Sequence, residues 1–265
     1  MTATLIQIAY SPWSEKARWA LDHHHVPYRK VEYLVMIGEP LLRLKLGKRR
    51  GPATVPALID RDQMFTDSWS IARHAEAVGS GAPLFPPHAI DAIRDFDERA
   101  ERLMAAGRAR TTARTLESAA ALKEALPPPL RLLGPAGLPI AKVGARFLQK
   151  KYATDAQSLD RHRRTIEEEL AGLRAALDGR DHLVGDAFSY ADVCMASALQ
   201  FVSPIELHGA RLDGSGLDGS GLDGSRLDGA RLGEATRAAW TEPDLASEYG
   251  DVLAWRDRLY ARRHG

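Results

Sequence analysis

The spacing of hydrophobic and polar positions changes partway along the chain. The segment TLIQIAY (Thr4–Tyr10) is short, partly β-branched and followed by a Ser-Pro pair, which is typical of a buried strand leading into a helix. Ser11 suits the N-cap of this helix and Pro12 suits its first position. Apolar residues then recur at helical spacing, and the helix is expected to end near the histidines at 23–25.

Strand patterns continue to about residue 66. Three further strands are predicted, in PYRKVEYL (27–34), VPALID (55–60) and QMFT (63–66). A helical or irregular stretch is expected through Leu46, after the first of these strands. DSWSIARHAEAVG predicts a closing helix with Asp67 and Ser68 as capping candidates and Gly79 just past its end. This β-α-β-α-β-β-α order is compact enough for one α/β domain.

Helical patterns take over beyond the Gly/Pro-punctuated segment GSGAPLFPPH. Long amphipathic patterns predict three helices, at 90–116, 155–177 and 249–263. A Gly/Pro-rich loop is expected near 127–139, because proline interrupts a regular helix. We therefore expect an α/β domain at 1–80, a linker at 81–87 and an all-helical domain at 88–265.

Composition narrows the class of partner. The 265 residues carry 36 Lys and Arg against 35 Asp and Glu, a net charge of +1 that gives no reason to expect nucleic acid. The single cysteine, Cys194, excludes an internal disulfide, a cysteine-based metal cluster and a dithiol redox cycle. The N-terminus has no signal-peptide pattern and no run reaches the length of a membrane span, so we expect a cytoplasmic protein with a small-molecule or protein partner.

Four motifs in order resemble the cytosolic glutathione S-transferase family: YSPWSEKARWAL, TVPALI, DSWSIARHAE and FSYADVCMASAL. The resemblance covers nearly the whole chain except the segments around 111–150 and 208–233. It implies an α/β thioredoxin-like N-terminal domain followed by an all-α helical-bundle C-terminal domain. It also implies that glutathione is a co-substrate, and that the protein is a homodimer with a role in detoxification.

Ser11 is the expected catalytic residue. The thiolate is the nucleophilic form of a thiol, and a hydroxyl donor at a helix N-terminus stabilises the sulfur anion. Ser11 matches the serine before proline that has this role in serine-type classes similar to the plant tau and phi enzymes. Other members place the hydroxyl elsewhere, so Ser14 and Tyr10 stay open, as does a plain capping role for Ser11.

The resemblance also implies the glutathione-binding residues. Pro56 matches a cis-proline that exposes the backbone of Val55 to the cysteinyl unit. Asp67 and Ser68 match an acidic-Ser pair that holds the γ-glutamyl end, and capping of the helix is compatible with that role. Thr54 departs from the family, where serine-type members often have a lysine, and basic residues at 45–50 are the alternative source of charge or a solvated face.

Other features receive structural interpretations. Ser189 and Asp192 are expected to form a capping box, and Cys194 is expected to be a small buried residue without a catalytic role. The consecutive histidines at 23–25 point in different directions, so no metal is expected there. Five pentads at 210–234 resemble a pentapeptide-repeat coil or form a flexible insertion, and the pattern of an EF-hand is missing.

The leading function is therefore a glutathione transferase that joins glutathione to a hydrophobic electrophile. The DSW motif is similar to that of bacterial etherase-like members, so ether cleavage with glutathione is a second form of this reaction. Three arginines of the first long helix are expected to meet an acidic substrate or to face water: Arg108, Arg110 and Arg114. The alternative is a non-catalytic binding or scaffolding protein. A thiol-disulfide oxidoreductase is nearly excluded, because positions 11 and 14 are serine.

Overall fold

The computed structural model describes residues 2–33, 42–43, 54–124, 138–139, 142–144, 146, 158–205 and 232–264. The described chain divides into two compact units, one made of residues up to Phe85 with Arg263 and His264, the other of the residues between Pro86 and Arg262. The basic residues at 45–50, and nearly all of the loop near 127–139 and of the repeat at 210–234, lie outside the described residues.

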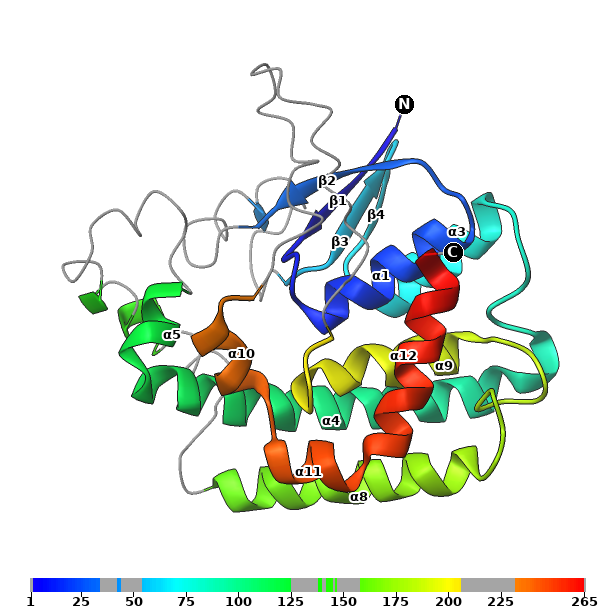
Figure 1. Cartoon of the computed structure of the whole chain (residues 1–265). Helices are drawn as coiled ribbons and strands as arrows, with labels where there is room; N and C mark the ends of the chain where they lie inside the picture. Colours follow the sequence, from blue (N-terminus) through cyan, green and yellow to red (C-terminus); the bar gives the residue numbers. More distant parts are fainter. Residues whose placement is uncertain are drawn as a thin grey trace. The chain divides into compact units, whose positions relative to one another are not determined.

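The first unit is built on a four-stranded sheet of order β2-β1-β3-β4 (Figure 1). The strands are β1 (Ala3–Gln7), β2 (Tyr28–Glu32), β3 (Ala57–Asp60) and β4 (Gln63–Phe65). β1 pairs with β2 in parallel and with β3 antiparallel, and β3 pairs antiparallel with β4. The predicted thioredoxin-like sheet is confirmed. β2, β3 and β4 lie inside the segments predicted for them, whereas β1 begins one residue before its predicted segment.

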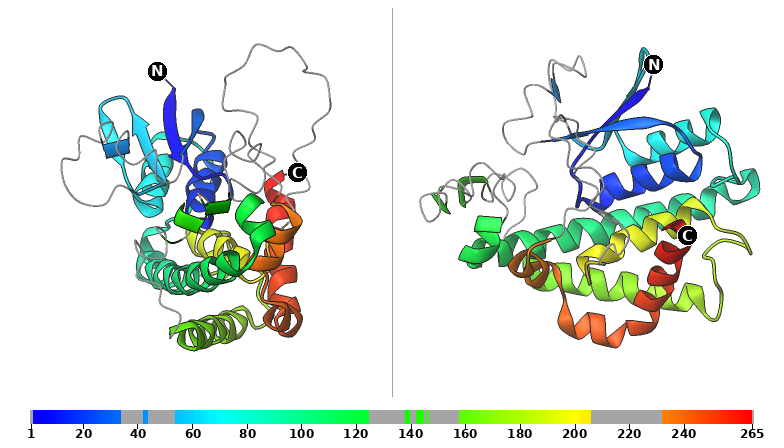
Figure 2. Two further views of the ribbon diagram at one scale, coloured as in Figure 1. Left: turned by 90° about the vertical axis from the view of Figure 1, so that its left-hand side faces the viewer. Right: turned by 45° about the horizontal axis from the view of Figure 1, so that its top comes forward.

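Two described helices of this unit, α1 (Pro12–His23) and α3 (Ser68–Val78), pack against each other (Figure 2). Ser11 is the N-cap of α1 and Pro12 its first residue, as predicted. Asp67 is the N-cap of α3 and Gly79 its C-cap, while Ser68, also a capping candidate, is the first helical residue instead.

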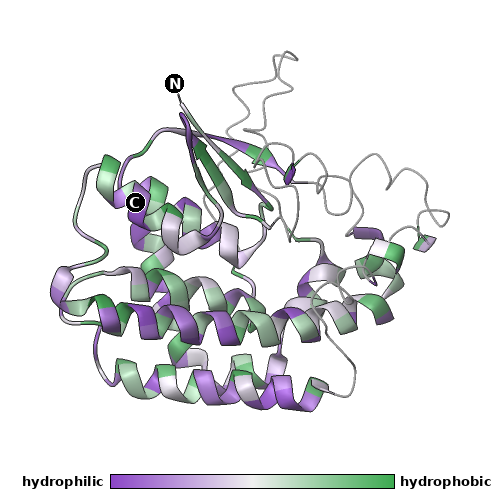
Figure 3. Cartoon of the chain, turned by 180° about the vertical axis from the view of Figure 1, so that it is seen from behind, coloured by the Kyte–Doolittle hydropathy of each residue, from purple (hydrophilic) through white to green (hydrophobic). Residues whose placement is uncertain are grey.

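The second unit is all-helical in its described residues, which confirms the predicted class of the C-terminal domain. Its helices are α4 (Ile90–Glu117), α5 (Ala119–Glu124), α8 (Leu159–Leu177), α9 (Tyr190–Ala198), α10 (Glu234–Trp240), α11 (Pro243–Glu248) and α12 (Gly250–His264) up to Arg262, with short 3₁₀ helices at Pro87–Ala89 and Leu199–Phe201. α4 packs on α8 and α9, and every residue of α9 is buried. Figure 3 shows hydrophobic and hydrophilic positions alternating along α4 and α8.

The predicted capping box of α9 is present. The Ser189 backbone N–H donates to Asp192 Oδ2 at 2.8 Å, and the Asp192 Oδ1 atom accepts from the Leu183 N–H at 2.9 Å. Burial raises the pKa of Asp192, although these hydrogen bonds oppose the rise. The motif therefore closes the start of a buried helix, which is a folding role.

Candidate functional site

Sheet register brings three predicted segments to one edge of the first unit. Ile6 near the end of β1 pairs with Ala57 at the start of β3, and Leu58 pairs with Phe65 at the end of β4. The turn after β1, the start of β3 and the start of α3 therefore adjoin the same edge of the sheet. These segments carry the predicted site residues Ser11, Val55, Pro56, Asp67 and Ser68.

Ser11 lies at the N-cap of α1 with extended backbone angles, φ −77° and ψ 127°, and is half-buried. Its N–H donates to the Ile8 carbonyl at 3.0 Å and its carbonyl accepts from the Glu15 N–H at 2.9 Å. Its side chain makes no capping hydrogen bond. The capping alternative for the Ser11 hydroxyl is therefore not realised, and the hydroxyl stands at the positive end of a 12-residue helix.

Ser14 and Tyr10 differ from Ser11 in their exposure. Ser14 is 0 % exposed, and its Oγ atom accepts a hydrogen bond from the Ile8 N–H at 3.2 Å. A side chain without accessible surface cannot touch a bound thiol in this conformation. Tyr10 is 45 % exposed on the same turn, so it stays an alternative to Ser11.

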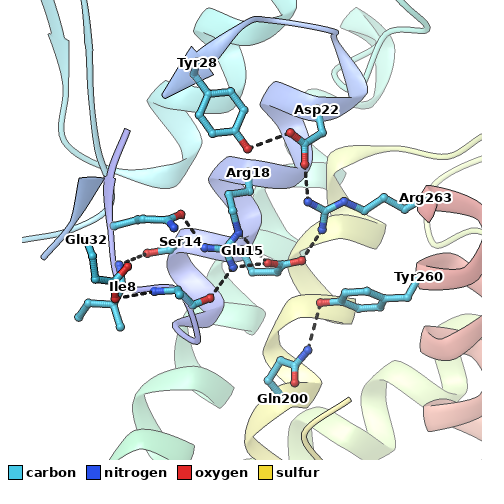
Figure 4. Close-up of polar contacts among 12 residues, drawn as sticks. Ile8, Ser14, Glu15, Arg18, Asp22, Tyr28, Glu32, Gln200, Tyr260 and Arg263 are labelled. Atoms are coloured by element: carbon cyan, nitrogen blue, oxygen red, sulfur yellow. Dashed lines mark hydrogen bonds and ion pairs between the residues drawn. The ribbon is translucent and has the colours of Figure 1, made fainter. Parts of the chain in front are cut away.

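A polar network underlies the turn before α1 (Figure 4). Arg18 is buried and donates to Gln7 Oε1 at 2.7 Å, to the Ala9 carbonyl at 2.7 Å and to Glu15 Oε2 at 3.0 Å. Glu32 Oε1 at the end of β2 accepts from the Ala9 N–H at 3.0 Å. Both backbone groups of Ala9 are therefore held by charged side chains.

The two carboxylates of this network have opposite pKa shifts. Burial alone would raise the pKa of Glu15, but the guanidinium groups of Arg263 and Arg18 lower it to about 2. Both arginines hydrogen-bond Glu15. Burial raises the pKa of Glu32, which the Ala9 N–H and Arg18 only partly oppose. Glu15 is thus held as an anion, whereas Glu32 lacks comparable compensation.

The peptide bond between Val55 and Pro56 is cis, as the resemblance implied. Pro56 is buried and Val55 is partly buried against a cluster of Ile6, Leu42 and Ala57. Thr54, which departs from the family pattern, is exposed. The roles of Val55 and Pro56 towards a ligand stay predictions.

Asp67 is exposed and caps α3. Its Oδ1 atom accepts from the Ser70 N–H at 2.7 Å and its Oδ2 atom from the Ser70 hydroxyl at 2.8 Å. An ionised carboxylate has about four lone-pair sites, so these bonds leave capacity for an ammonium group. Ser68 is only 5 % exposed, which limits its contact with a ligand to a small part of its surface.

Two arginines of α4, Arg110 and Arg114, bind a glutamate inside the second unit. Arg110 Nε donates to Glu242 Oε1 at 2.6 Å, and Arg114 donates to the same oxygen and to the Thr241 carbonyl at 2.5 Å. Burial lowers the pKa of Arg114 to about 10. In the structure both guanidinium groups pair with a buried glutamate, which lies 132 and 128 residues away in sequence. Contact with an acidic substrate stays a prediction.

Cys194 is fully buried, and its Sγ atom donates to Asp97 Oδ1 at 3.1 Å. Within the described residues no three His, Cys, Asp or Glu side chains are placed to hold a metal ion. The described part of the chain also contains no helix long and apolar enough to cross a membrane.

Sequence reasoning gave no role to three side chains of the polar network near the turn, those of Gln7, Arg18 and Glu32. One sequence signal could have indicated this network: Glu15 and Arg18 form a charged pair at i and i+3 on α1, and the residues next to them on the helix are buried. Glu32 offers no such signal, because its contact depends on the pairing of β1 with β2.

Two family models match the chain. The description "Glutathione S-transferase, N-terminal domain" matches residues 5–82, and "Glutathione S-transferase, C-terminal domain" matches residues 135–208. Together they span more than half of the chain, and the first includes all five predicted site residues. No curated protein sequence matches the chain.

Solved structures share the fold at low sequence identity. A glutathione S-transferase of Methylobacterium radiotolerans in complex with glutathione sulfonate is 20% identical, with a TM-score of 0.57 over 99% of this chain and 92% of that one. A glutathione transferase of Phanerochaete chrysosporium is 15% identical, with a TM-score of 0.61 over 100% and 99%. A glutathione S-transferase of Methylobacillus flagellatus with glutathione bound is 18% identical, with a TM-score of 0.51 over 94% and 98%. With both domain models matched and this fold observed, the chain belongs to the glutathione S-transferase family.

Proposed function

We propose that this protein is a glutathione transferase that activates the glutathione thiol for attack on a hydrophobic electrophile. The observation that carries the proposal is the Ser11 side chain, which stands at the N-terminus of α1 without a capping hydrogen bond. Family membership and two relatives solved with glutathione or its sulfonate support glutathione as the thiol.

The proposed chemistry needs a lower thiol pKa. A free thiol has a pKa of about 8.5, so little thiolate exists at neutral pH. A hydroxyl donor and the positive end of a helix each stabilise the anion by about 1 kcal/mol, and one pKa unit corresponds to about 1.4 kcal/mol. Together they lower the thiol pKa by roughly 1.5 units, to near 7. The thiol proton passes to water while Ser11 donates its O–H to the sulfur, and the thiolate then attacks the electrophile and displaces its leaving group, which is a halide ion in the case of an aryl halide.

The proposed binding residues occupy the same sheet edge. The Val55 backbone beside cis-Pro56 takes the cysteinyl unit. Asp67 pairs with the γ-glutamyl ammonium, and Ser68 with the first N–H groups of α3 takes the α-carboxylate. We place this binding in a domain at 1–80, followed by a linker at 81–87 and a helical domain at 88–265. A homodimer in the cytoplasm is part of the same proposal.

Two measurements test the function. The wild-type protein is expected to be retained on immobilised glutathione and to conjugate a generic aryl halide. Retention without conjugation of any tested electrophile would favour the non-catalytic binding protein instead. A protein that shows neither binding nor conjugation would overturn the proposal.

A further inference from the structure

Both backbone polar groups of Ala9, two positions before Ser11, are hydrogen-bonded to side chains. The Ala9 N–H donates to Glu32 Oε1 at 3.0 Å, and the Ala9 carbonyl accepts from Arg18 Nη2 at 2.7 Å (Figure 4). The neighbouring Ile8 is also fully engaged, because its N–H donates to Ser14 and its carbonyl accepts from Ser11. The backbone that leads into Ser11 therefore has a defined partner at each of these four polar groups.

Glu32 reaches the turn because of the register of the parallel strand pair. Gln7, the last residue of β1, pairs with Glu32, the last residue of β2, so the side chain starts beside the end of β1. Ala9 follows two residues later. Arg18 of α1 donates to the carbonyl of the same residue, Ala9, and its positive charge also interacts with the Glu32 carboxyl and opposes the rise in its pKa.

The partly buried position of the Glu32 carboxyl costs folding free energy. Its Oε2 atom is buried and has no hydrogen-bond partner in the described structure, and burial raises the pKa of the group. A buried polar oxygen without a partner costs free energy that an apolar side chain would avoid. The compensating gain visible in the structure is the bond to the Ala9 N–H, which fixes the turn.

We propose that Glu32 is a positioning residue for the Ser11 hydroxyl. By holding the Ala9 N–H, it fixes the direction in which the chain enters the N-cap of α1. A displacement of about 1 Å at a reacting group can reduce a rate by as much as 10²-fold, so a loose turn weakens thiol activation more than glutathione binding. The inference rests on the proposed function, since it needs Ser11 to stabilise a thiolate.

The experiment compares Glu32→Ala, Glu32→Gln and the wild type. Glutamine keeps a side-chain oxygen that accepts from the Ala9 N–H but carries no charge, whereas alanine removes the acceptor. Arg29→Ala is the matched control, because Arg29 also lies on β2 and its Nε donates across to Thr4 Oγ1 on β1 at 2.7 Å, away from the turn. Each variant is measured for the pKa of the bound glutathione thiol by its ultraviolet thiolate absorbance, for kcat and KM, and for exchange of the Ala9 amide hydrogen.

Glu32→Ala is expected to raise the thiol pKa, to lower kcat at neutral pH by about 10-fold with KM for glutathione within about twofold, and to speed Ala9 amide exchange. Glu32→Gln and Arg29→Ala are expected to stay within about twofold of the wild type on each measure. Wild-type thiol pKa and kcat in Glu32→Ala, or an equal loss in Glu32→Gln, would overturn the positioning role while leaving the proposed function intact. Absence of thiolate in the wild type would overturn the proposed function and this inference with it.

Discussion

The Oγ atom of Ser14 accepts a hydrogen bond from the backbone N–H of Ile8 at 3.2 Å, and Ser14 has no exposed surface. Ser11, three residues earlier in the same motif, is half-buried and makes no side-chain capping bond. Of the two serine hydroxyls of this motif, one is thus part of the folded framework and the other is available at the helix N-terminus. This difference supports Ser11 in the proposed mechanism.

Removing Asp192 is expected to destabilise the protein. Asp192→Ala leaves the buried N–H groups of Ser189 and Leu183 without their acceptor, at a cost of about 3 kcal/mol in the free energy of unfolding. Equilibrium urea denaturation measures this loss. Ser197→Ala on the same helix is the control, because Ser197 Oγ is buried without a hydrogen-bond partner in the described structure. The control is expected to be neutral or stabilising, and equal losses in both variants would contradict the capping role.

Glu242 is expected to matter for stability more than an exposed acid nearby. Glu242→Ala leaves Arg110 and Arg114 partly buried without their carboxylate, which should cost about 3 kcal/mol in the free energy of unfolding. Asp244→Ala is the control, because its side chain is 78% exposed and lies 3.7 Å from Arg163, and such pairs contribute less than about 1 kcal/mol. A shift in the urea midpoint no larger for Glu242→Ala than for Asp244→Ala would contradict the buried ion cluster.

Gly107 permits close packing of α4 on the segment that follows α9. A Cβ atom at Gly107 would lie 2.3 Å from Phe201 Cβ, and Phe201 is itself stacked on Trp240 with ring centroids 4.7 Å apart. Gly107→Ala is therefore expected to lower the free energy of unfolding by about 1 to 3 kcal/mol. Gly250→Ala, where a Cβ would meet nothing within 4 Å, should leave stability unchanged or slightly higher. Thermal denaturation that ranks the two variants in the opposite order would refute the packing argument.

Glu15 is expected to make the free energy of unfolding depend on pH in the acid range. Its pKa falls from the ordinary 4.5 to about 2 in the folded protein, against the opposing effect of burial and because of Arg263 and Arg18. A lowered folded-state pKa adds stability above the unfolded value, and that stability is lost as the pH falls through the folded value. The contribution of up to about 3 kcal/mol is thus present above about pH 5 and disappears towards pH 2. Glu15→Gln has no carboxyl to titrate there.

Denaturation of wild type and Glu15→Gln between pH 6 and pH 2 checks this prediction. The advantage of the wild type should shrink as the pH falls across this range, even if Glu15→Gln is less stable throughout. A difference in unfolding free energy that stays constant from pH 6 to pH 2 would show that the Glu15 pKa is not lowered.

The elements of the first unit were predictable because local signals agree there. Ser11 with Pro12 starts α1, Asp67 starts α3, and short, partly β-branched runs next to turn residues mark the strands. The cis bond before Pro56 followed from the family resemblance and not from local sequence, since most X-Pro bonds are trans.

Contacts that depend on tertiary placement were not predictable. Arg110 meets Glu242 across 132 sequence positions, and Glu32 meets Ala9 only because β2 pairs with β1 in one register. Neither contact leaves a periodic or short-range pattern in the sequence. The sequence motifs therefore indicated the residues proposed to touch the ligand, while the side chains that hold those residues required the structure.

The most direct test of the proposed mechanism is the pKa of the glutathione thiol bound to wild type, Ser11→Ala and Ser14→Ala, measured from the thiolate absorbance as a function of pH. We expect Ser11→Ala to raise this pKa by roughly 0.7 units, which corresponds to about 1 kcal/mol of lost stabilisation, with glutathione still bound. Ser14→Ala is expected to lower folding stability and to change the thiol pKa less. An unchanged thiol pKa in Ser11→Ala, or a larger rise in Ser14→Ala, would contradict the assignment of Ser11.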